Sequence, residues 1–239
     1  MKKLPEIDSQ TRLDLEEAIR EVHLIAGFDV GDHSGTAYAD RGVRPQRLAR
    51  RSIAVGVTSP DYGDGKTTIA IALAASLSHD FGTNVTLVDA DFHTHSVERQ
   101  YGLEGQVGFA EVLAGTTVLP DATHDIQNAS IRIVPAGLVS SDPARLARSD
   151  RLGPAVDQMK SANSHVVLDL PATLHSMNAP ALAQRCDAVI VVARSGRTTR
   201  AQLDRALHLL RDANVIGVVM NRQRSSIPTW VQRTLGVRA

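Results

Sequence analysis

Short runs of apolar residues alternate with longer stretches of helical spacing over most of the chain after residue 51. The runs are rich in Val and Ile, and several are apolar at consecutive positions, as strands covered by helices on both faces must be. This alternation predicts parallel strands joined by crossover helices. The expected strands are 52–58, 84–89, 131–135, 165–170, 188–193 and 215–221, and the expected helices are 66–81, 107–114, 143–162, 179–185 and 198–213.

The two ends of the chain have different patterns. Residues 7–28 carry apolar side chains at helical spacing, which predicts an amphipathic helix. Residues 29–51 combine glycines and a proline with arginines, which indicates a basic, solvated linker. We therefore expect three parts: a helix and linker in 1–51, an α/β domain in 52–222, and a tail in 223–239. The tail contains either a packing helix around Trp230 or a short membrane-surface helix.

Composition limits the setting in which the chain works. Its 239 residues carry a net charge of +0, so no overall field favours nucleic acid or an anionic membrane, and no nucleic-acid partner is expected. Its single cysteine, Cys186, cannot form an internal disulfide. No apolar run approaches the roughly 20 residues of a membrane-spanning helix. We expect a cytoplasmic protein.

A glycine-rich segment lies between the first expected strand and the helix behind it. Glycines allow successive backbone amides to turn inward around a phosphate, and the helix N-terminus adds partial positive charge. The alternative is an ordinary turn, but the strand, loop and helix come in the order that a phosphate loop requires. Pro60 stands where such loops usually begin with glycine. The predicted nucleotide-binding residues of the loop are Gly63, Asp64, Gly65, Lys66, Thr67 and Thr68.

Acidic residues end two of the expected strands. The second strand ends in Val88-Asp89-Ala90-Asp91, which puts Asp89 and Asp91 at its carboxyl end, and Asp169 stands at the end of the fourth. The carboxyl ends of parallel strands are where open α/β sheets bind ligands. A single strand-end aspartate often caps the next helix. Three of them beside a phosphate loop favour a metal and catalytic cluster instead.

With these motifs the chain resembles the bacterial tyrosine kinase family, the cytoplasmic ATPases of capsule and exopolysaccharide assembly. The resemblance covers most of residues 51–222. Besides the phosphate loop, it rests on the order and spacing of several short motifs, which are Thr58-Ser59, Val88-Asp89-Ala90-Asp91, Tyr101-Gly102-Leu103, Gly108-Phe109, Val112-Leu113, Pro135-Ala136-Gly137, Asp142-Pro143-Ala144, Asp169-Leu170-Pro171, Asp187-Ala188 and Gly217-Val218-Val219-Met220-Asn221-Arg222.

The resemblance implies a three-layer P-loop NTPase fold with a mostly parallel sheet, an N-terminal helical extension, and binding of ATP with Mg²⁺. It implies that Lys66 and Thr67 hold phosphate and magnesium, and that Asp91 and Asp169 complete the metal environment. Asp89 is the expected acceptor of the hydroxyl proton. The candidate catalytic residues are therefore Lys66, Asp89 and Asp91, and the candidate metal ligands are Thr67, Asp91 and Asp169.

Two further features carry over from the family. Asn221 occupies the position that reads the adenine edge in this superfamily, although an asparagine can also simply end a strand. Residues 17–23 are similar to the segment through which family members associate into rings. His23 replaces the last arginine of that segment, so a homo-oligomer through the N-terminal helix is expected only if the remaining positions suffice.

The chain also departs from the family pattern. His93 stands where the family often has an arginine, and a neutral histidine cannot replace a permanently charged guanidinium. The tail has no tyrosine, whereas these kinases phosphorylate a tyrosine cluster there. The three tyrosines of the chain are Tyr38, Tyr62 and Tyr101. Tyr38, in the linker, is the expected phosphoacceptor.

The resulting hypothesis is an ATP-hydrolysing or phosphotransferring protein of exopolysaccharide or capsule biosynthesis and export. Its expected partner is a membrane-embedded polysaccharide co-polymerase that activates it and holds it peripherally at the inner membrane. One alternative is a non-phosphorylating, ATP-dependent switch of the same system. A second is a spatial organiser of the septum-site or partition type, but those ATPases carry a second lysine where this chain has Asp61. A third is a module that binds nucleotide without turning it over.

Overall fold

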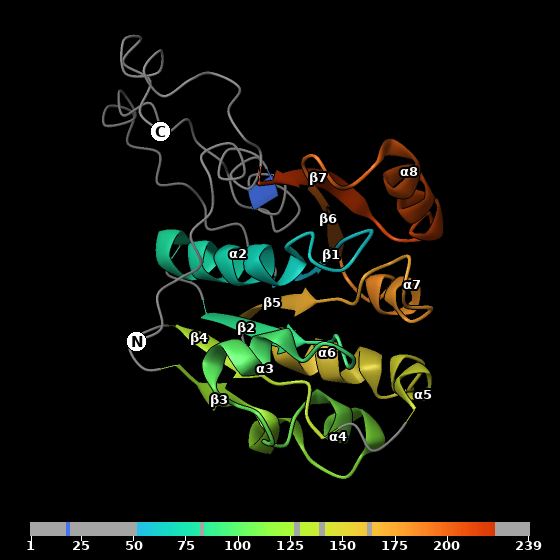
Figure 1. The fold of residues 1–239 in the computed structure, drawn as a ribbon. Coiled ribbons are helices and arrows are strands. Elements are labelled where there is room, and N and C mark those ends of the chain that lie inside the picture. The colour runs from blue at the N-terminus through green and yellow to red at the C-terminus, as the bar shows by residue number, and fades with distance from the viewer. Residues whose placement is uncertain are drawn as a thin grey trace, which may run out of the picture.

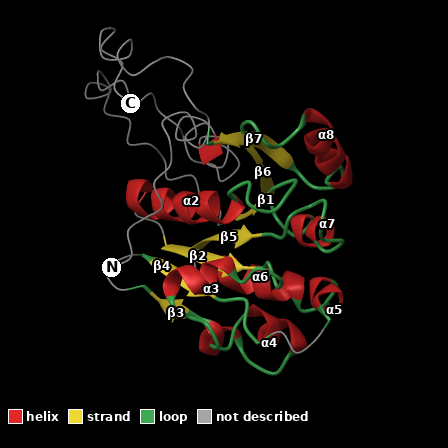
Figure 2. Ribbon diagram, in the orientation of Figure 1, coloured by secondary structure: helices red, strands yellow, loops and turns green. Residues whose placement is uncertain are grey.

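The computed structural model describes residues 18–19, 52–81, 84–126, 130–138, 142–161 and 164–222. They form a seven-stranded sheet in the order β3-β4-β2-β5-β1-β6-β7, with helices around it (Figures 1 and 2). Neighbouring strands are parallel, except that β3 is antiparallel to β4. The strands are β1 (Ala54–Thr58), β2 (Asn84–Asp89), β3 (His124–Asp125), β4 (Ile131–Val134), β5 (Ser164–Asp169), β6 (Ala188–Arg194) and β7 (Val215–Asn221).

Two apolar cores lie on the two faces of the sheet. One core contains side chains of α2 and α3, and the other contains side chains of α4, α5, α6, α7 and α8. The expected α/β architecture with three layers is therefore confirmed. The helices are α2 (Lys66–Phe81), α3 (Ser96–Tyr101), α4 (Phe109–Ala114), α5 (Pro143–Ala147), α6 (Leu152–Ser161), α7 (Ala179–Ala183) and α8 (Arg200–Leu209), and a 3₁₀ helix, η1, spans Leu119–Ala122.

Strand β1 lies between β5 and β6, and its side chains are apolar on both faces because each face packs against one of the two cores. Val55 and Val57 are buried in the α2-side core, while Ala54 belongs to the opposite core. Gly56 also faces that opposite side, where an added Cβ would lie 2.7 Å from Leu170 Cδ1. A larger residue would therefore require the side chains of Leu170 and Cys186 to shift.

The register of the strands brings the acidic strand ends together. Val57 of β1 is paired with Asp169 of β5, and Asp89 of β2 is paired with the same Asp169. The phosphate loop follows β1 directly. The register of the sheet therefore places Asp89 and Asp169 beside that loop, as expected for parallel neighbours, and Asp91 follows two residues after the end of β2.

Several elements differ from the sequence prediction. The expected helix 143–162 is divided into α5 and α6. Pro154 lies in the first turn of α6, where its missing N–H has no intrahelical partner to lose, whereas the interior of one long helix would exclude it. The helix expected at 107–114 begins at Phe109, and that expected at 198–213 is shortened to Arg200–Leu209. Elements α3, η1 and β3 were not predicted.

The flanking regions lie almost entirely outside the described residues. Of the expected N-terminal helix, only Ala18 and Ile19 are described; they are helical and buried in the α2-side core. The linker with Tyr38 and the tail after Arg222 fall outside the described ranges, so the division into 1–51, 52–222 and 223–239 stays a prediction. No described helix has both the length and the apolar character needed to cross a membrane.

Candidate functional site: a phosphate loop beside three carboxylates

The loop between β1 and α2 has the backbone of a phosphate cradle. Gly63 and Gly65 adopt φ values of 77° and 104°, which only glycine adopts without strain. Helix α2 begins at Lys66, and the amide of Ile69 donates to Gly65 O at 3.0 Å. Thr67 and Thr68 lie in the first turn of α2. The N-terminus of a 16-residue helix therefore faces the loop, which suits an anion.

Lys66 is held between two carboxylates. Its Nζ lies 2.8 Å from Asp91 Oδ2 and 3.5 Å from Asp169 Oδ1. Burial lowers the pKa of Lys66, but Asp169 and Asp91 more than offset this, so the pKa lies above its ordinary value. Lys66 is therefore a buried, permanent cation at the loop.

Asp169 joins the end of β5 to the start of α2. Its Oδ2 accepts a hydrogen bond from Thr67 Oγ1 at 2.6 Å. Burial raises the pKa of Asp169, and the opposing effects of Lys66 and the Thr67 hydrogen bond only partly reduce this rise. A buried carboxylate that needs a cation for full ionisation is a suitable ligand for a divalent metal.

Asp91 is the most strongly ionised acid of the cluster. Burial works against its charge, but Lys66, together with hydrogen bonds from Thr94 Oγ1 and the His93 amide, holds the pKa of Asp91 below its usual range. His93 contacts Asp91 through its backbone amide. The other histidine of this segment, His95, pairs with Glu98 at 2.9 Å.

Asp89 has a different environment. Its Oδ2 accepts the amides of Val97 at 2.9 Å and Glu98 at 3.4 Å, and its Oδ1 accepts the amide of Asp91 at 3.2 Å. Burial, with the nearby charge of Asp169, raises the pKa of Asp89 to about 8. Asp89 therefore caps the first turn of α3, the structural role weighed above for a strand-end aspartate. Its expected role as proton acceptor stays a prediction.

Asn221, at the end of β7, lies against the phosphate loop. Its Nδ2 donates to Asp64 O at 2.8 Å, and a Cβ added to Gly65 would collide with the same amide. This contact brings the far strand of the sheet to the loop. The predicted reading of adenine by Asn221 is not tested by it.

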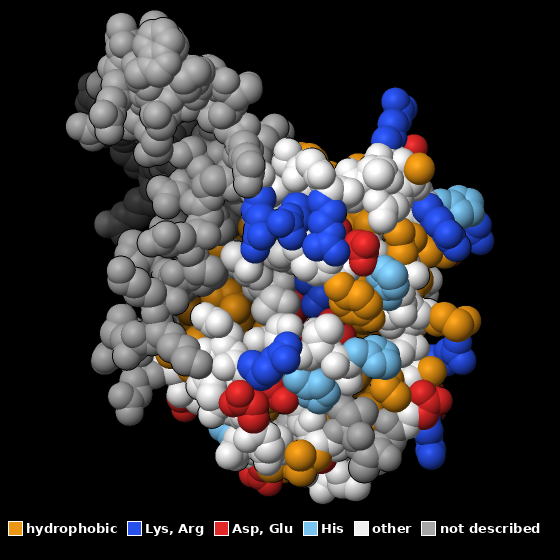
Figure 3. Space-filling model, viewed as in Figure 1, with side chains coloured by type: hydrophobic (Ala, Val, Ile, Leu, Met, Phe, Trp, Pro, Cys, Tyr) orange, Lys and Arg blue, Asp and Glu red, His pale blue; other side chains and the backbone are white. Residues whose placement is uncertain are grey.

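Two arginines that the sequence analysis did not single out also lie at the loop. Arg194 donates from Nη1 to Gly63 O at 3.3 Å, and Arg197 Nη1 lies 3.0 Å from the position of a Cβ on Gly63. Figure 3 shows Lys and Arg side chains gathered over this part of the molecule. The run Arg194-Ser195-Gly196-Arg197, directly after an expected strand, was the available signal.

The side chains at the loop suit Mg²⁺, which needs few protein ligands, better than a metal whose ligands all come from the protein. In the parts of the chain that the structure describes, no three His, Cys, Asp or Glu side chains are arranged as a metal site. Mg²⁺ usually takes one or two carboxylates, with phosphate and water oxygens completing its octahedron. Thr67, Asp91 and Asp169 offer oxygen ligands of that kind, beside a cradle for the phosphates.

The family model for ParA, described as an NUBPL iron-transfer P-loop NTPase, matches residues 50–234. The chain belongs to the ParA family of P-loop NTPases. Its relatives include the tyrosine-protein kinase CpsD of Streptococcus agalactiae, which is 25% identical over 179 residues that cover 74% of this chain and 77% of that protein.

Solved structures support the same fold for this ParA-family chain. The kinase domain of the Escherichia coli tyrosine kinase ETK superposes with a TM-score of 0.68 at 21% identity, over 74% of this chain and 71% of that one. The septum site-determining protein MinD of Pyrococcus horikoshii, complexed with Mg-ADP, superposes with a TM-score of 0.60 at 23% identity, over 78% and 79%. The expected P-loop NTPase fold is thus confirmed, and the similarity to bacterial tyrosine kinases with it.

Proposed function

We propose that this protein hydrolyses ATP and transfers its γ-phosphoryl group, as a tyrosine kinase-like enzyme of exopolysaccharide or capsule assembly. The observation that carries the proposal is the position of Lys66 between Asp91 and Asp169, with Thr67 bonded to Asp169, at the end of the phosphate loop. Phosphoryl transfer depends on positioning and on electrostatic stabilisation, and this cluster supplies both.

Each side chain has a role in this proposal. Lys66 binds the β and γ phosphates through its ammonium group, and Thr67, Asp91 and Asp169 hold Mg²⁺. A bound Mg²⁺ would neutralise charge on the phosphate oxygens. Asp89 accepts the proton of the attacking hydroxyl. Asn221 reads the adenine edge from the other side of the loop.

The identity of the acceptor separates a kinase from a switch that only hydrolyses ATP. Tyr101 is half-buried beside the α2-side core, and Tyr62 belongs to the phosphate loop. We therefore keep Tyr38 as the proposed acceptor. ATP labelled in the γ-phosphate should be followed into both protein and free phosphate. Label on the wild-type protein that disappears in Tyr38→Phe supports the kinase, whereas hydrolysis without label on the protein supports the switch.

A spatial organiser of the septum-site type is the second candidate, because MinD shares the fold. Its distinguishing lysine is replaced here by Asp61, whose Oδ1 lies 2.7 Å from His175 Nε2. A carboxyl group cannot supply the positive charge that this lysine brings to the phosphates of another copy, and Asp61 instead contacts His175 of its own chain. This favours the kinase-like function.

The partner of the proposed enzyme is a membrane-embedded polysaccharide co-polymerase that activates it at the inner membrane, on the cytoplasmic side. Support comes from the relatives named tyrosine-protein kinases, such as CpsD. We further propose that the N-terminal helix contributes to a homo-oligomer. Co-purification of the full chain, and of the chain without residues 1–51, with the membrane partner and with a second copy of itself tests both proposals.

The raised pKa of Asp89 gives the proposed base a pH signature. At pH values below its pKa of about 8, the Asp89 carboxyl is mostly protonated and cannot accept a proton. The kcat/KM should therefore rise with pH up to about 8 and then level off. In Asp89→Asn, kcat/KM measured across the same pH range should not show this rise, and most of the turnover should be lost. A mutant that keeps the rise would limit Asp89 to capping α3.

A further inference from the structure

The segment that follows Asp169 runs along the outer arm of the phosphate loop. The amides of Thr173 and Leu174 donate to Ser59 O and Pro60 O at 2.8 Å and 3.2 Å. Thr58 Oγ1 donates to Pro171 O at 2.8 Å and lies 3.0 Å from Thr173 Oγ1. Residues 171–174 are therefore hydrogen-bonded to residues 58–60 along their length.

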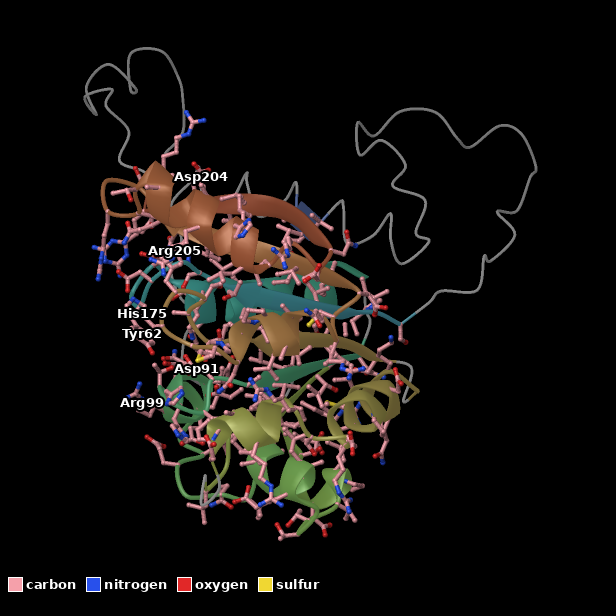
Figure 4. The ribbon with its side chains drawn as sticks, turned by 90° about the vertical axis from the view of Figure 1, so that its right-hand side faces the viewer. Tyr62, Asp91, Arg99, His175, Asp204 and Arg205 are labelled. Carbon is pink, nitrogen blue, oxygen red and sulfur yellow. The ribbon has the colours of Figure 1, made fainter. Side chains whose placement is uncertain are left out.

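His175 extends this pairing by one more residue. Its Nε2 lies 2.7 Å from Asp61 Oδ1, and its ring stacks on that of Tyr62 with centroids 4.8 Å apart and planes at 27°. Figure 4 shows Tyr62 and His175 side by side, above Asp91. Asp61 Oδ1 also accepts the backbone amide of Tyr62 at 2.7 Å, so one carboxylate contacts the His175 ring and the backbone of the residue on which that ring stacks.

These contacts bear on Asp169, the proposed metal ligand. Asp169 begins the segment, and its Oδ2 bonds Thr67 at the start of α2. The segment is thus attached to the phosphate loop at both ends: at Asp169 through Thr67, and at His175 through Asp61 and Tyr62. Hydrogen bonds to an ionised acceptor are among the stronger ones, and stacked rings add to them.

We propose that Asp61, Tyr62 and His175 form a loop clamp, and that His175 is a positioning residue that holds Asp169 in place for Mg²⁺. This inference rests on the proposed function. His175 acts through Asp61 and the backbone of residues 171–174 and touches no reacting atom. Its side chain is 44% exposed, so replacing it leaves the apolar cores intact.

The test compares four variants of the full chain. His175→Ala and Asp61→Ala remove the contact between His175 Nε2 and Asp61 Oδ1, whereas Asp61→Asn keeps an oxygen acceptor in the same place. Arg200→Ala is the matched control, because it removes an exposed ion pair with Asp204 on α8, at 3.7 Å. For each protein, amide exchange at Thr173 and Leu174, the KM for ATP and the Mg²⁺ concentration at half-maximal turnover are measured.

With His175→Ala or Asp61→Ala, amide exchange at Thr173 and Leu174 and the half-saturating Mg²⁺ concentration should each rise by about tenfold, as for loss of one charged hydrogen bond. In His175→Ala the KM for ATP should change by less than about twofold, because His175 contacts the Asp61 side chain and the Tyr62 ring and none of the loop amides. Asp61→Asn, which keeps an oxygen acceptor without its charge, should give values between those of the wild type and Asp61→Ala, and Arg200→Ala should not depart from the wild type. Unchanged exchange, or faster exchange with unchanged Mg²⁺ dependence, would overturn the clamp. If the wild type releases no phosphate, the proposed function fails, while amide exchange still decides whether the clamp exists.

Discussion

Asp169→Asn is expected to lower phosphate release from Mg·ATP by about 100-fold or more, since it removes a charged metal ligand at the centre of the cluster. The same substitution should keep or raise the melting temperature. Because the pKa of Asp169 is raised, the folded state binds this proton more tightly than the unfolded state does, and the ionised side chain destabilises the fold at neutral pH. A neutral, isosteric amide removes that cost.

Because phosphate release should fall while the melting temperature stays the same or rises, a catalytic role of Asp169 can be distinguished from a structural one. Turnover and thermal unfolding should be measured on the same preparations, with Asp204→Asn as the control because Asp204 is exposed on α8. Loss of activity together with a lower melting temperature would indicate that Asp169 is structural. Full activity in Asp169→Asn would remove it from the metal site.

Gly65→Ala is the second substitution with a large expected effect. The residue has φ of 104°, which costs an L-amino acid about 1–3 kcal/mol, and the new Cβ would collide with the Asn221 amide. The loop has to move away from Asn221, and its amides no longer converge. We expect affinity for Mg·ATP to fall by about 100-fold, corresponding to roughly 3 kcal/mol.

Titration calorimetry with Mg·ATP measures this effect directly. Gly217→Ala is the matched control, since Gly217 lies in β7 with no positive φ, and no atom of the described residues lies within 4 Å of an added Cβ. The control should bind as the wild type does. Wild-type affinity in Gly65→Ala would show that the cradle does not depend on this backbone conformation.

The phosphate loop and the main strands could be predicted because their signals are local. A run such as β1, apolar at consecutive positions and followed by Gly63, Gly65 and Lys66, contains the strand, the turn and the helix start in one stretch of sequence. The strand-end positions of Asp89 and Asp169 could be predicted for the same reason. Once the strands are parallel neighbours, their ends meet.

The remaining features depend on contacts between distant residues. Helix α3 is only six residues long, and its first turn is capped by Asp89 from β2, which no helical periodicity reveals. Asp61 and His175 are separated by more than a hundred residues in sequence. Their pairing arises only because β1 and β5 are adjacent.

The central claim is that Lys66 and its carboxylates form a centre for phosphoryl chemistry. Its most direct test is release of γ-phosphate from Mg·ATP by the wild-type protein and by Lys66→Met, each alone and with a membrane activator. We predict release by the wild type that falls by at least about 100-fold in Lys66→Met, as expected when a charged group at the transferred phosphate is lost. Release by the wild type no faster than by Lys66→Met would contradict the claim and leave a protein that only binds nucleotide.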